Sequence, residues 1–230
     1  MKTYLECIPC FFRQAIEASR MAGLSVKKQK KIVDELGSVL PEISLSFCPP
    51  EAVRVVNKIL KENIKRHDIY AKIKRKSNRM GLLIYDKLKR KVAFSKDKLL
   101  AAVEIAVAGN IIDYGAKNHL DVDKELKKMM DKEHDTIKKE NKQIFEYEKF
   151  KRQVKQAKTI LYLADNAGET VFDRVLIEEI KKADGAKKIK YAVKEKPVIN
   201  DALKEDAIFC GIDQEAEIIS SGTDTPGTVL

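Results

Sequence analysis

The feature that most constrains the fold is a change of hydrophobic period at about residue 157. Up to about residue 153, apolar residues recur at spacings of three and four, as in CFFRQAIEASRMA and EAVRVVNKILKENI, which is the pattern of amphipathic helices. Beyond residue 157, short apolar runs alternate with polar stretches. The sequence therefore predicts a helical lobe over residues 1–153, followed by an α/β domain over residues 154–230.

Three apolar runs, TILYLA, KIKYAVK and AEIISS, are interpreted as the strands of a mostly parallel sheet. The stretch VFDRVLIEEIKKA between the first two runs has the period of an amphipathic crossover helix. Three strands are fewer than a parallel sheet usually contains, and TPGTVL resembles the first turn of a further helix. We therefore expect the α/β domain to be C-terminally truncated, at Leu230.

The formal net charge of +10 favours anionic ligands, among them phosphorylated metabolites, nucleic acids and acidic lipids. The lysines alternate with acids along helical stretches and no aromatic-basic motif is present, so we expect no nucleic-acid partner. The N-terminus lacks the apolar core of a secretory signal, and no apolar stretch is long enough to span a bilayer. We expect a cytoplasmic protein without a membrane partner, whose Lys- and Glu-rich surface is of the kind found in thermophiles.

Polar side chains follow each predicted strand: DNAGET at 165–170, KEKPVIND at 194–201 and SSGTDTPGT at 220–228. In parallel sheets, ligands gather outside the carboxyl ends of the strands, so these three segments are the candidates for chemistry. The Asp and Asn oxygens of the first two segments are hard ligands that suit Mg²⁺, Mn²⁺ or a similar divalent ion. The hydroxyl-rich third segment suits a phosphate or a sugar. The sequence thus predicts a metal that bridges a phosphate group and water.

Each motif also has a purely structural interpretation, because Asp, Asn and Gly are common in turns and at helix caps. Their occurrence at successive strand ends favours the metal site over this interpretation. Either Asp165 or a water activated by the metal is a candidate nucleophile, and the sequence leaves that choice open.

Five blocks of sequence carry a resemblance to a known family: ECIPCFFRQA at 6–15, AGNIIDYG at 108–115, LADNAGE at 163–169, VKEKPVINDAL at 193–203 and SSGTDTPGTVL at 220–230. In this order they resemble the damage-control phosphatases, long catalogued as a domain of unknown function, and in particular the archaeal single-domain type. The resemblance implies a helical lobe followed by a three-layer α/β domain, an architecture of the α+β or α/β class. It also implies hydrolysis of phosphate monoesters of small metabolites such as sugar phosphates, with Mn²⁺, Mg²⁺, Co²⁺ or Ni²⁺ as the cofactor.

The same resemblance assigns metal ligation to Asp165, Asn166 and Asp201, the two aspartates being the catalytic residues. Substrate and phosphate binding is expected from a wider set, in which Lys194 occupies a position where relatives often carry arginine. The set comprises Asn110, Asp113, Glu169, Lys194, Asn200, Ser221, Gly222 and Thr223. For Asn110 and Asp113 the alternative is a helix cap and a surface turn. For Ser221, Gly222 and Thr223 the alternative is a simple polar loop.

The cysteines and histidines give weaker signals. Cys7 and Cys10 form one close pair, whereas Cys48 and Cys210 lie far from it in the sequence, so buried reduced thiols are expected in preference to structural zinc or a Cys7–Cys10 disulfide. The histidines have no mutual spacing and are interpreted as surface residues: His67, His119 and His134.

Two other functions remain open from the sequence. One is a non-catalytic protein that binds the metal and a phosphometabolite but does not turn it over. The other is an adenosylmethionine-dependent methyltransferase, which disagrees with the lack of a Gly-rich loop after the first predicted strand. The small predicted sheet also leads us to expect a homo-oligomer.

Overall fold

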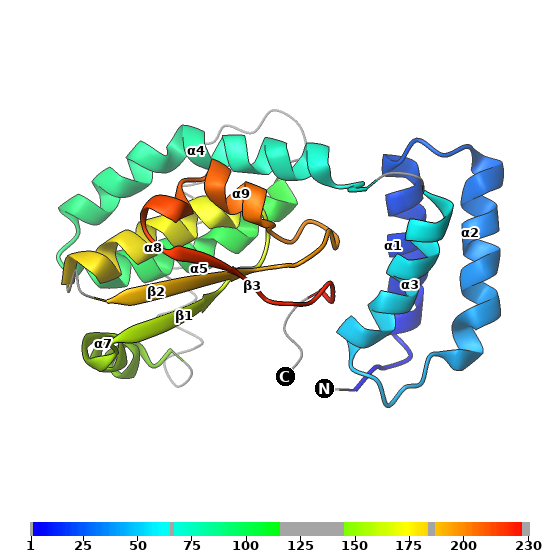
Figure 1. Cartoon of the computed structure of the whole chain (residues 1–230), viewed down its shortest axis with the longest axis horizontal. Coiled ribbons are helices and arrows are strands. Elements are labelled where there is room, and N and C mark those ends of the chain that lie inside the picture. Colours follow the sequence, from blue (N-terminus) through cyan, green and yellow to red (C-terminus); the bar gives the residue numbers. More distant parts are fainter. Residues whose placement is uncertain (1, 65–66, 116–144, 184–186, 227–230) are drawn as a thin grey trace. The chain divides into compact units, whose positions relative to one another are not determined.

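The computed structural model describes the backbone of residues 2–64, 67–115, 145–183 and 187–226, and the side chains of these residues except 110–115 and 183. The chain divides into two compact units (Figure 1). We call Met1–Lys72, Lys194–Asn200 and Gly222–Leu230 the helical unit, and Ile73–Val193 with Asp201–Ser221 the sheet unit.

Three helices form the body of the helical unit: α1 (Cys7–Met21), α2 (Val26–Val39) and α3 (Pro49–Asn63), with a 3₁₀ turn η1 (Leu40–Glu42) after α2. Each helix packs on the other two along its apolar stripe. At the start of α3 the Glu51 carboxylate accepts the Cys48 N–H at 2.9 Å, which satisfies a backbone donor that a helix end leaves open. The core contains Phe11, Ile32, Leu36, Val56 and Ile59.

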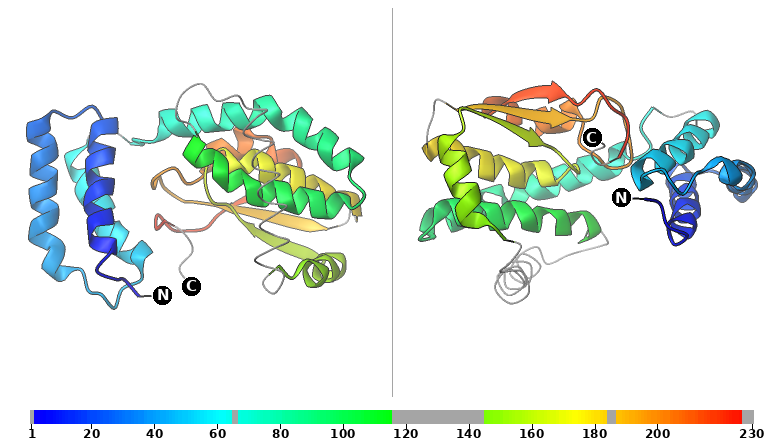
Figure 2. Two further views of the ribbon diagram at one scale, coloured as in Figure 1. Left: turned by 180° about the vertical axis from the view of Figure 1, so that it is seen from behind. Right: turned by 90° about the horizontal axis from the view of Figure 1, so that it is seen from below.

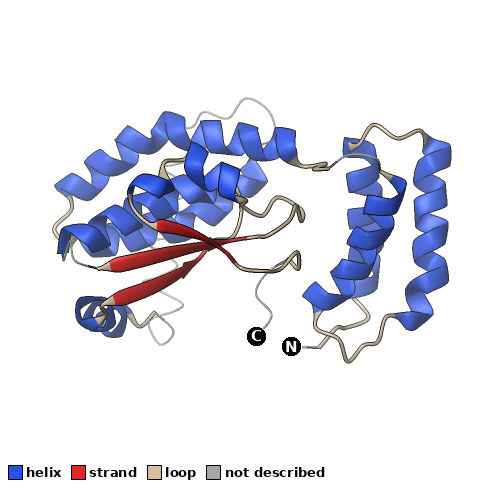
Figure 3. Cartoon of the chain, in the orientation of Figure 1, coloured by secondary structure: helices blue, strands red, loops and turns tan. Residues whose placement is uncertain are grey.

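The sheet unit contains three parallel strands in the order β1-β2-β3, which are β1 (Thr159–Leu163), β2 (Lys188–Val193) and β3 (Glu217–Ser220). Helix α8 (Glu169–Ala183) connects β1 to β2, while α9 (Lys204–Phe209) and η2 (Ile212–Gln214) lie between β2 and β3 (Figure 3). Both connections follow the crossover pattern that parallel strands require. The predicted fold class, a parallel α/β sheet preceded by helices, is confirmed.

Helix α8 is the centre of the sheet unit. It packs on one face of the sheet, and α4 (Ala71–Phe94) and α5 (Lys98–Gly115) pack on its other side (Figure 2). A β-carbon at Gly109 would lie 3.0 Å from the Phe172 side chain, so the close approach of α5 to α8 favours glycine there. Between residues 171 and 180 only Arg174 is not buried. This part of the helix is therefore covered by other elements, instead of having one buried face and one face exposed to solvent.

The compact units do not coincide with the predicted boundary at 153/154. That boundary follows the change from helices to strands along the chain, whereas α4 and α5 pack on α8 within the sheet unit. The division into residues 1–153 and 154–230 stays a prediction about domains. No helix within the described residues is long and apolar enough to cross a membrane.

Asp97, directly before α5, ties this helix to α7 (Tyr147–Gln156). Its carboxylate accepts the Leu100 N–H at 3.1 Å and the Tyr147 hydroxyl at 2.7 Å, and it lies 2.7 Å from the Lys151 ammonium. The hydrogen bond from Lys151 and those from Leu100 and Tyr147 lower the pKa of Asp97 to about 2. One carboxylate thus caps α5 and anchors α7.

Asp97→Asn should destabilise the protein by about 1 kcal/mol at pH 7, a value below the full shift because the carboxylate is 34% exposed. The folded pKa lies below the unfolded one, so this contribution is present above about pH 4 and is lost as the pH falls toward 2. Urea unfolding between pH 7 and pH 3 measures it. Asp34→Asn on α2, which removes an exposed helical ion pair, is the control. A difference that does not shrink on acidification would contradict this assignment.

Candidate metal centre

Backbone hydrogen bonds bring the segments after β1 and β2 together within the sheet unit. The strand ladder continues past β1, where the Ala164 N–H donates to the Ala192 carbonyl at 2.9 Å. One residue later the Asp165 carbonyl accepts the Ala202 N–H at 2.8 Å, and Asn166 forms an antiparallel bridge with Asp201. The three predicted ligands, Asp165, Asn166 and Asp201, are therefore neighbours at the carboxyl edge of the sheet.

The amide of Asn166 has a fixed orientation. Its Nδ2 donates to Glu169 Oε1 at 2.7 Å, and a carboxylate can only accept, so the nitrogen is the end that faces Glu169. The amide oxygen is consequently the end that faces away from Glu169. Glu169 is the first residue of α8 and is buried, and its negative charge is favourable at a helix N-terminus. This residue, which the sequence analysis predicts to line the substrate pocket, thus contacts a predicted metal ligand.

The donor set fits a hard divalent ion. Two carboxylates and one amide oxygen leave further positions for water and substrate oxygens, which suits Mg²⁺ or Mn²⁺ better than a thiophilic metal. Among the described residues no group of three or more His, Cys, Asp or Glu side chains forms a metal cluster. The candidate site therefore depends on the amide of Asn166 as well as on Asp165, which is exposed, and Asp201, which is 1% exposed.

A further carboxylate, that of Asp173, lies near Asp165 in the interior of the sheet unit. Asp173 on α8 accepts the hydroxyls of Tyr162 and Tyr191 at 2.5 and 2.6 Å, and the two rings stack at 5.4 Å. Burial, opposed by the two tyrosine hydrogen bonds and reinforced by the negative charge of Asp165, raises the pKa of Asp173 to about 6. The sequence analysis missed this residue, although an acid inside the apolar stretch VFDRVLI was a signal for a buried, hydrogen-bonded carboxylate.

The other predicted substrate residues divide between the two units. Ser221 belongs to the sheet unit, where its N–H donates to the Val193 carbonyl at 2.8 Å. Lys194, Asn200, Gly222 and Thr223 belong to the helical unit. There the Glu195 N–H donates to the Thr223 carbonyl at 3.0 Å, which joins the segments that follow β2 and β3. The side chains of two further candidates lie outside the described residues, namely Asn110 and Asp113.

The backbone is strained just before Asp201. Ile199 has a φ of 36°, a left-handed conformation that a β-branched residue rarely adopts. The side-chain amide nitrogen Nδ2 of the next residue, Asn200, is buried without a hydrogen-bond partner among the described residues. Strain of this kind is found preferentially at functional sites, where the surrounding structure holds it in place.

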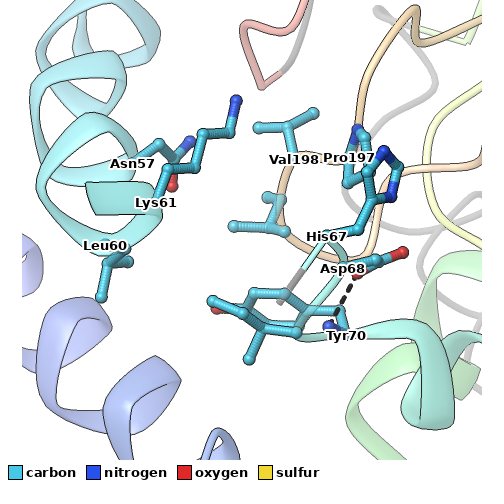
Figure 4. Close-up of a pocket in the computed structure, with 10 residues that line it drawn as sticks. Asn57, Leu60, Lys61, His67, Asp68, Tyr70, Pro197 and Val198 are labelled. Carbon is cyan, nitrogen blue, oxygen red and sulfur yellow. Dashed lines mark hydrogen bonds between the residues drawn. The ribbon is translucent and has the colours of Figure 1, made fainter. Parts of the chain in front are cut away.

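Ile199 also lines a small cavity of the helical unit, with Asn57 and residues 67–70 (Figure 4). Within it, Asp68 Oδ1 accepts the Tyr70 N–H at 2.8 Å. The cavity volume of about 30 Å³ admits one or two water molecules and no metabolite.

A wider groove of about 560 Å³ lies along α3 in the same unit. Arg54, Lys58 and Lys61 line it, at the i, i+4 and i+7 spacing that places them on one helix face. Asp224 enters the groove, 3.6 Å from Arg54 and 3.2 Å from Lys61, and these cations lower its pKa against the opposing effect of burial. The sequence analysis did not single out this basic face, although the spacing was visible in EAVRVVNKILK.

All four cysteines are free thiols. The expectation of buried thiols is correct for Cys210, where burial raises the pKa to about 12. It is wrong for Cys10, which is exposed, and it holds only in part for Cys7 and Cys48. The CxxC spacing places Cys10 on the outer face of α1, away from its apolar stripe. His67 is exposed as predicted. Two histidines, His119 and His134, lie outside the described residues.

Comparison with known families defines the class. The model of the damage-control phosphatase ARMT1-like domain matches residues 3–230, and the chain belongs to this family. It is therefore a phosphatase by class, and the methyltransferase alternative is set aside.

Two relatives that are named damage-control phosphatases agree with this class. A damage-control phosphatase of Pyrococcus horikoshii is 31% identical over 233 residues, which cover 100% of this chain and 77% of the relative. A damage-control phosphatase of Archaeoglobus fulgidus is 30% identical, with 100% and 78% covered. An uncharacterized protein of Methanocaldococcus jannaschii is 35% identical, with 98% and 73% covered. The crystal structure of a DUF89 family protein from P. horikoshii has a TM-score of 0.84 at 27% identity, with 99% of this chain and 76% of that chain covered.

Glu169→Gln should raise the dissociation constant for Mn²⁺ about tenfold, because glutamine both donates and accepts and no longer holds the Asn166 oxygen in one direction. Isothermal titration calorimetry measures this constant. Glu205→Gln removes the same charge from an exposed position of α9 and should leave the affinity unchanged. Equal affinities of wild type and Glu169→Gln would show that Glu169 does not orient the amide.

Proposed function

We propose that this chain is a divalent-metal-dependent phosphatase that hydrolyses phosphate monoesters of small metabolites such as sugar phosphates. The observation that carries the proposal is the pairing of Asn166 with Asp201, together with the bond between Ala202 and Asp165, at adjacent strand ends. It gathers three hard oxygen donors in a chain that belongs to a phosphatase family.

In this proposal Asp165, Asn166 and Asp201 hold the ion, and Asp165 and Asp201 are the catalytic carboxylates. The bound ion would neutralise charge on the phosphate group and activate the attacking oxygen. Mn²⁺, Mg²⁺, Co²⁺ and Ni²⁺ all accept oxygen ligands, so the donor set supports a divalent ion without selecting one.

The N-terminus of α8 offers a place for phosphate oxygens. This helix begins at Glu169, directly after the small residues Ala167 and Gly168, and the N-terminus of a helix attracts anions through its free N–H groups and its dipole. Gly168 has a φ of 93°, so glycine supports the turn that leads into the helix. The proposed ligands immediately precede this turn, which would place a phosphate between the ion and the helix.

Substrate recognition is proposed for the remaining residues of the family motifs. Lys194 would neutralise phosphate as a point charge. The net charge of +10 supports attraction of an anionic metabolite. The other members proposed to contact substrate are Asn110, Asp113, Glu169, Asn200, Ser221, Gly222 and Thr223.

We also propose that the protein is cytoplasmic and that it forms a homo-oligomer. A phosphorylated small metabolite as substrate is consistent with a cytoplasmic protein. Leu161 and Leu163 of β1 are 59% and 49% exposed, and exposed apolar side chains on a strand support self-association.

Asp165→Asn and Asp201→Asn should each lower metal-dependent phosphate release by at least about 10²–10³-fold, because each removes a charge that holds the ion. Release is measured on sugar phosphates and an aromatic phosphate with Mn²⁺, Mg²⁺, Co²⁺, Ni²⁺ or chelator. Asp213→Asn, exposed on η2, is the control and should keep wild-type activity.

Undiminished metal-dependent release from both variants would refute the assignment of the site. A wild-type chain that binds the ion tightly but releases no phosphate would instead identify a metal- and phosphometabolite-binding protein without turnover.

A further inference from the structure

Two buried side chains link the segments that carry the proposed metal ligands. Two residues after Asn166, the Gly168 N–H donates to Asn78 Oδ1 at 2.7 Å. Two residues after Asp201, the Leu203 N–H donates to Asp206 Oδ2 at 3.0 Å. Asn78 Nδ2 in turn donates to Asp206 Oδ1 at 2.8 Å. A continuous chain of hydrogen bonds therefore runs from one ligand segment to the other through the interior of the sheet unit.

The orientation of the Asn78 amide is determined by its partners. Asp206 is a carboxylate and only accepts, so the amide nitrogen must face it, and the amide oxygen then faces the Gly168 N–H. The amide thus donates one hydrogen bond to Asp206 and accepts one from Gly168, and so connects the two. Neither an alanine nor an apolar isostere reproduces this connection.

Lys74 completes the network. It lies one helical turn before Asn78 on α4, and its ammonium is 3.2 Å from Asp206 Oδ2. The side chains of Lys74 and Asp206 are only 2% and 9% exposed. Removing two charges from water costs several kcal/mol per ion before their attraction is counted, so a buried pair is weak evidence for stability alone. Because Asp206 also accepts the Leu203 N–H, the ion pair belongs to the network that links the two ligand segments, which favours a role in positioning them.

Steric contacts hold the first ligand segment against α4. A β-carbon at Gly168 would lie 2.7 Å from Ser77 Cβ, and a β-carbon at Gly81 would lie 3.1 Å from the Gly168 carbonyl oxygen. Asn78 lies between these two contacts along the helix. The DNAG turn is thus seated on α4 by close packing on both sides of the hydrogen bond from Gly168 to Asn78.

We propose that Asn78, supported by the Lys74–Asp206 ion pair, is a positioning residue that sets the separation of the two ligand segments and thereby the affinity for the metal ion. This inference rests on the proposed function. Asn78 touches neither segment at a ligand residue: it acts on Asn166 through Gly168 and on Asp201 through Asp206 and Leu203. A purely structural role would stabilise the fold but would leave the metal affinity of the folded protein unchanged.

The test compares Asn78→Ala with Ser77→Ala. Ser77 is the adjacent residue of α4, is 1% exposed, and has a hydroxyl without a hydrogen-bond partner among the described residues, so its variant removes no link in the network. Mn²⁺ affinity is measured by calorimetry on each folded 230-residue chain, well below its own melting temperature. We expect the dissociation constant of Asn78→Ala to rise by about tenfold or more, and that of Ser77→Ala to stay within about twofold.

Two further readouts separate positioning from other roles. Phosphate release by Asn78→Ala should recover toward the wild-type rate at saturating Mn²⁺, because no group that contacts the substrate is lost. Hydrogen exchange at the Gly168 amide of the metal-free chain should accelerate in Asn78→Ala and not in Ser77→Ala, since only the former loses the acceptor.

Folded Asn78→Ala with wild-type Mn²⁺ affinity would overturn the inference. Should that variant not fold, Asn78→Asp is measured in the same way. It keeps an acceptor for Gly168 but sets a carboxylate against Asp206, and an unchanged affinity there also overturns the inference. Failure of the wild type to bind any divalent ion would refute the proposed function itself, which distinguishes the two failures.

Discussion

The pairing of β1 with β2 is the interaction on which the rest depends, because it continues past both strands into the residues that carry the oxygen donors. Parallel strands end at the same edge of a sheet. Here the bonds from Ala164 to Ala192 and from Ala202 to Asp165 extend that pairing, and the bridge between Asn166 and Asp201 completes it. The separation of the two backbone segments that carry the proposed donors is therefore set by backbone hydrogen bonds.

Helix α8 connects the strand ends to the rest of the sheet unit. It is enclosed by the sheet on one side and by α4 and α5 on the other, so each polar group on it needs a partner. Asp173 has two tyrosine hydroxyls, and Glu178 accepts from Arg174 at 3.0 Å and from Tyr85. Glycine at 109 allows the close packing. Because the helix is fixed, its N-terminus and Glu169 are fixed beside the proposed ligands.

Much of the fold could be predicted because hydrophobic period is a local property. The three strands followed from short runs of six or seven residues, and the crossover helix from the amphipathic stretch VFDRVLIEEIKKA. The enclosure of α8 could not be predicted in this way, since VFDRVLIEEIKKA has a pattern that fits one covered face as well as several. The burial of cysteines was predicted from residue type alone, and Cys10 shows that position on the helix decides it.

The sequence by itself determined which residues follow the strands, and therefore that Asp165, Asn166 and Asp201 are candidate ligands at one edge of a parallel sheet. Only the tertiary structure decided how those residues are held. Asn78 and Asp206 are 128 positions apart, Asn78 and Gly168 are 90 apart, and no periodic pattern connects such distant polar residues. Their pairing results from the packing of α4 against the sheet unit, because burial forces each polar group to find the partner that the fold places beside it.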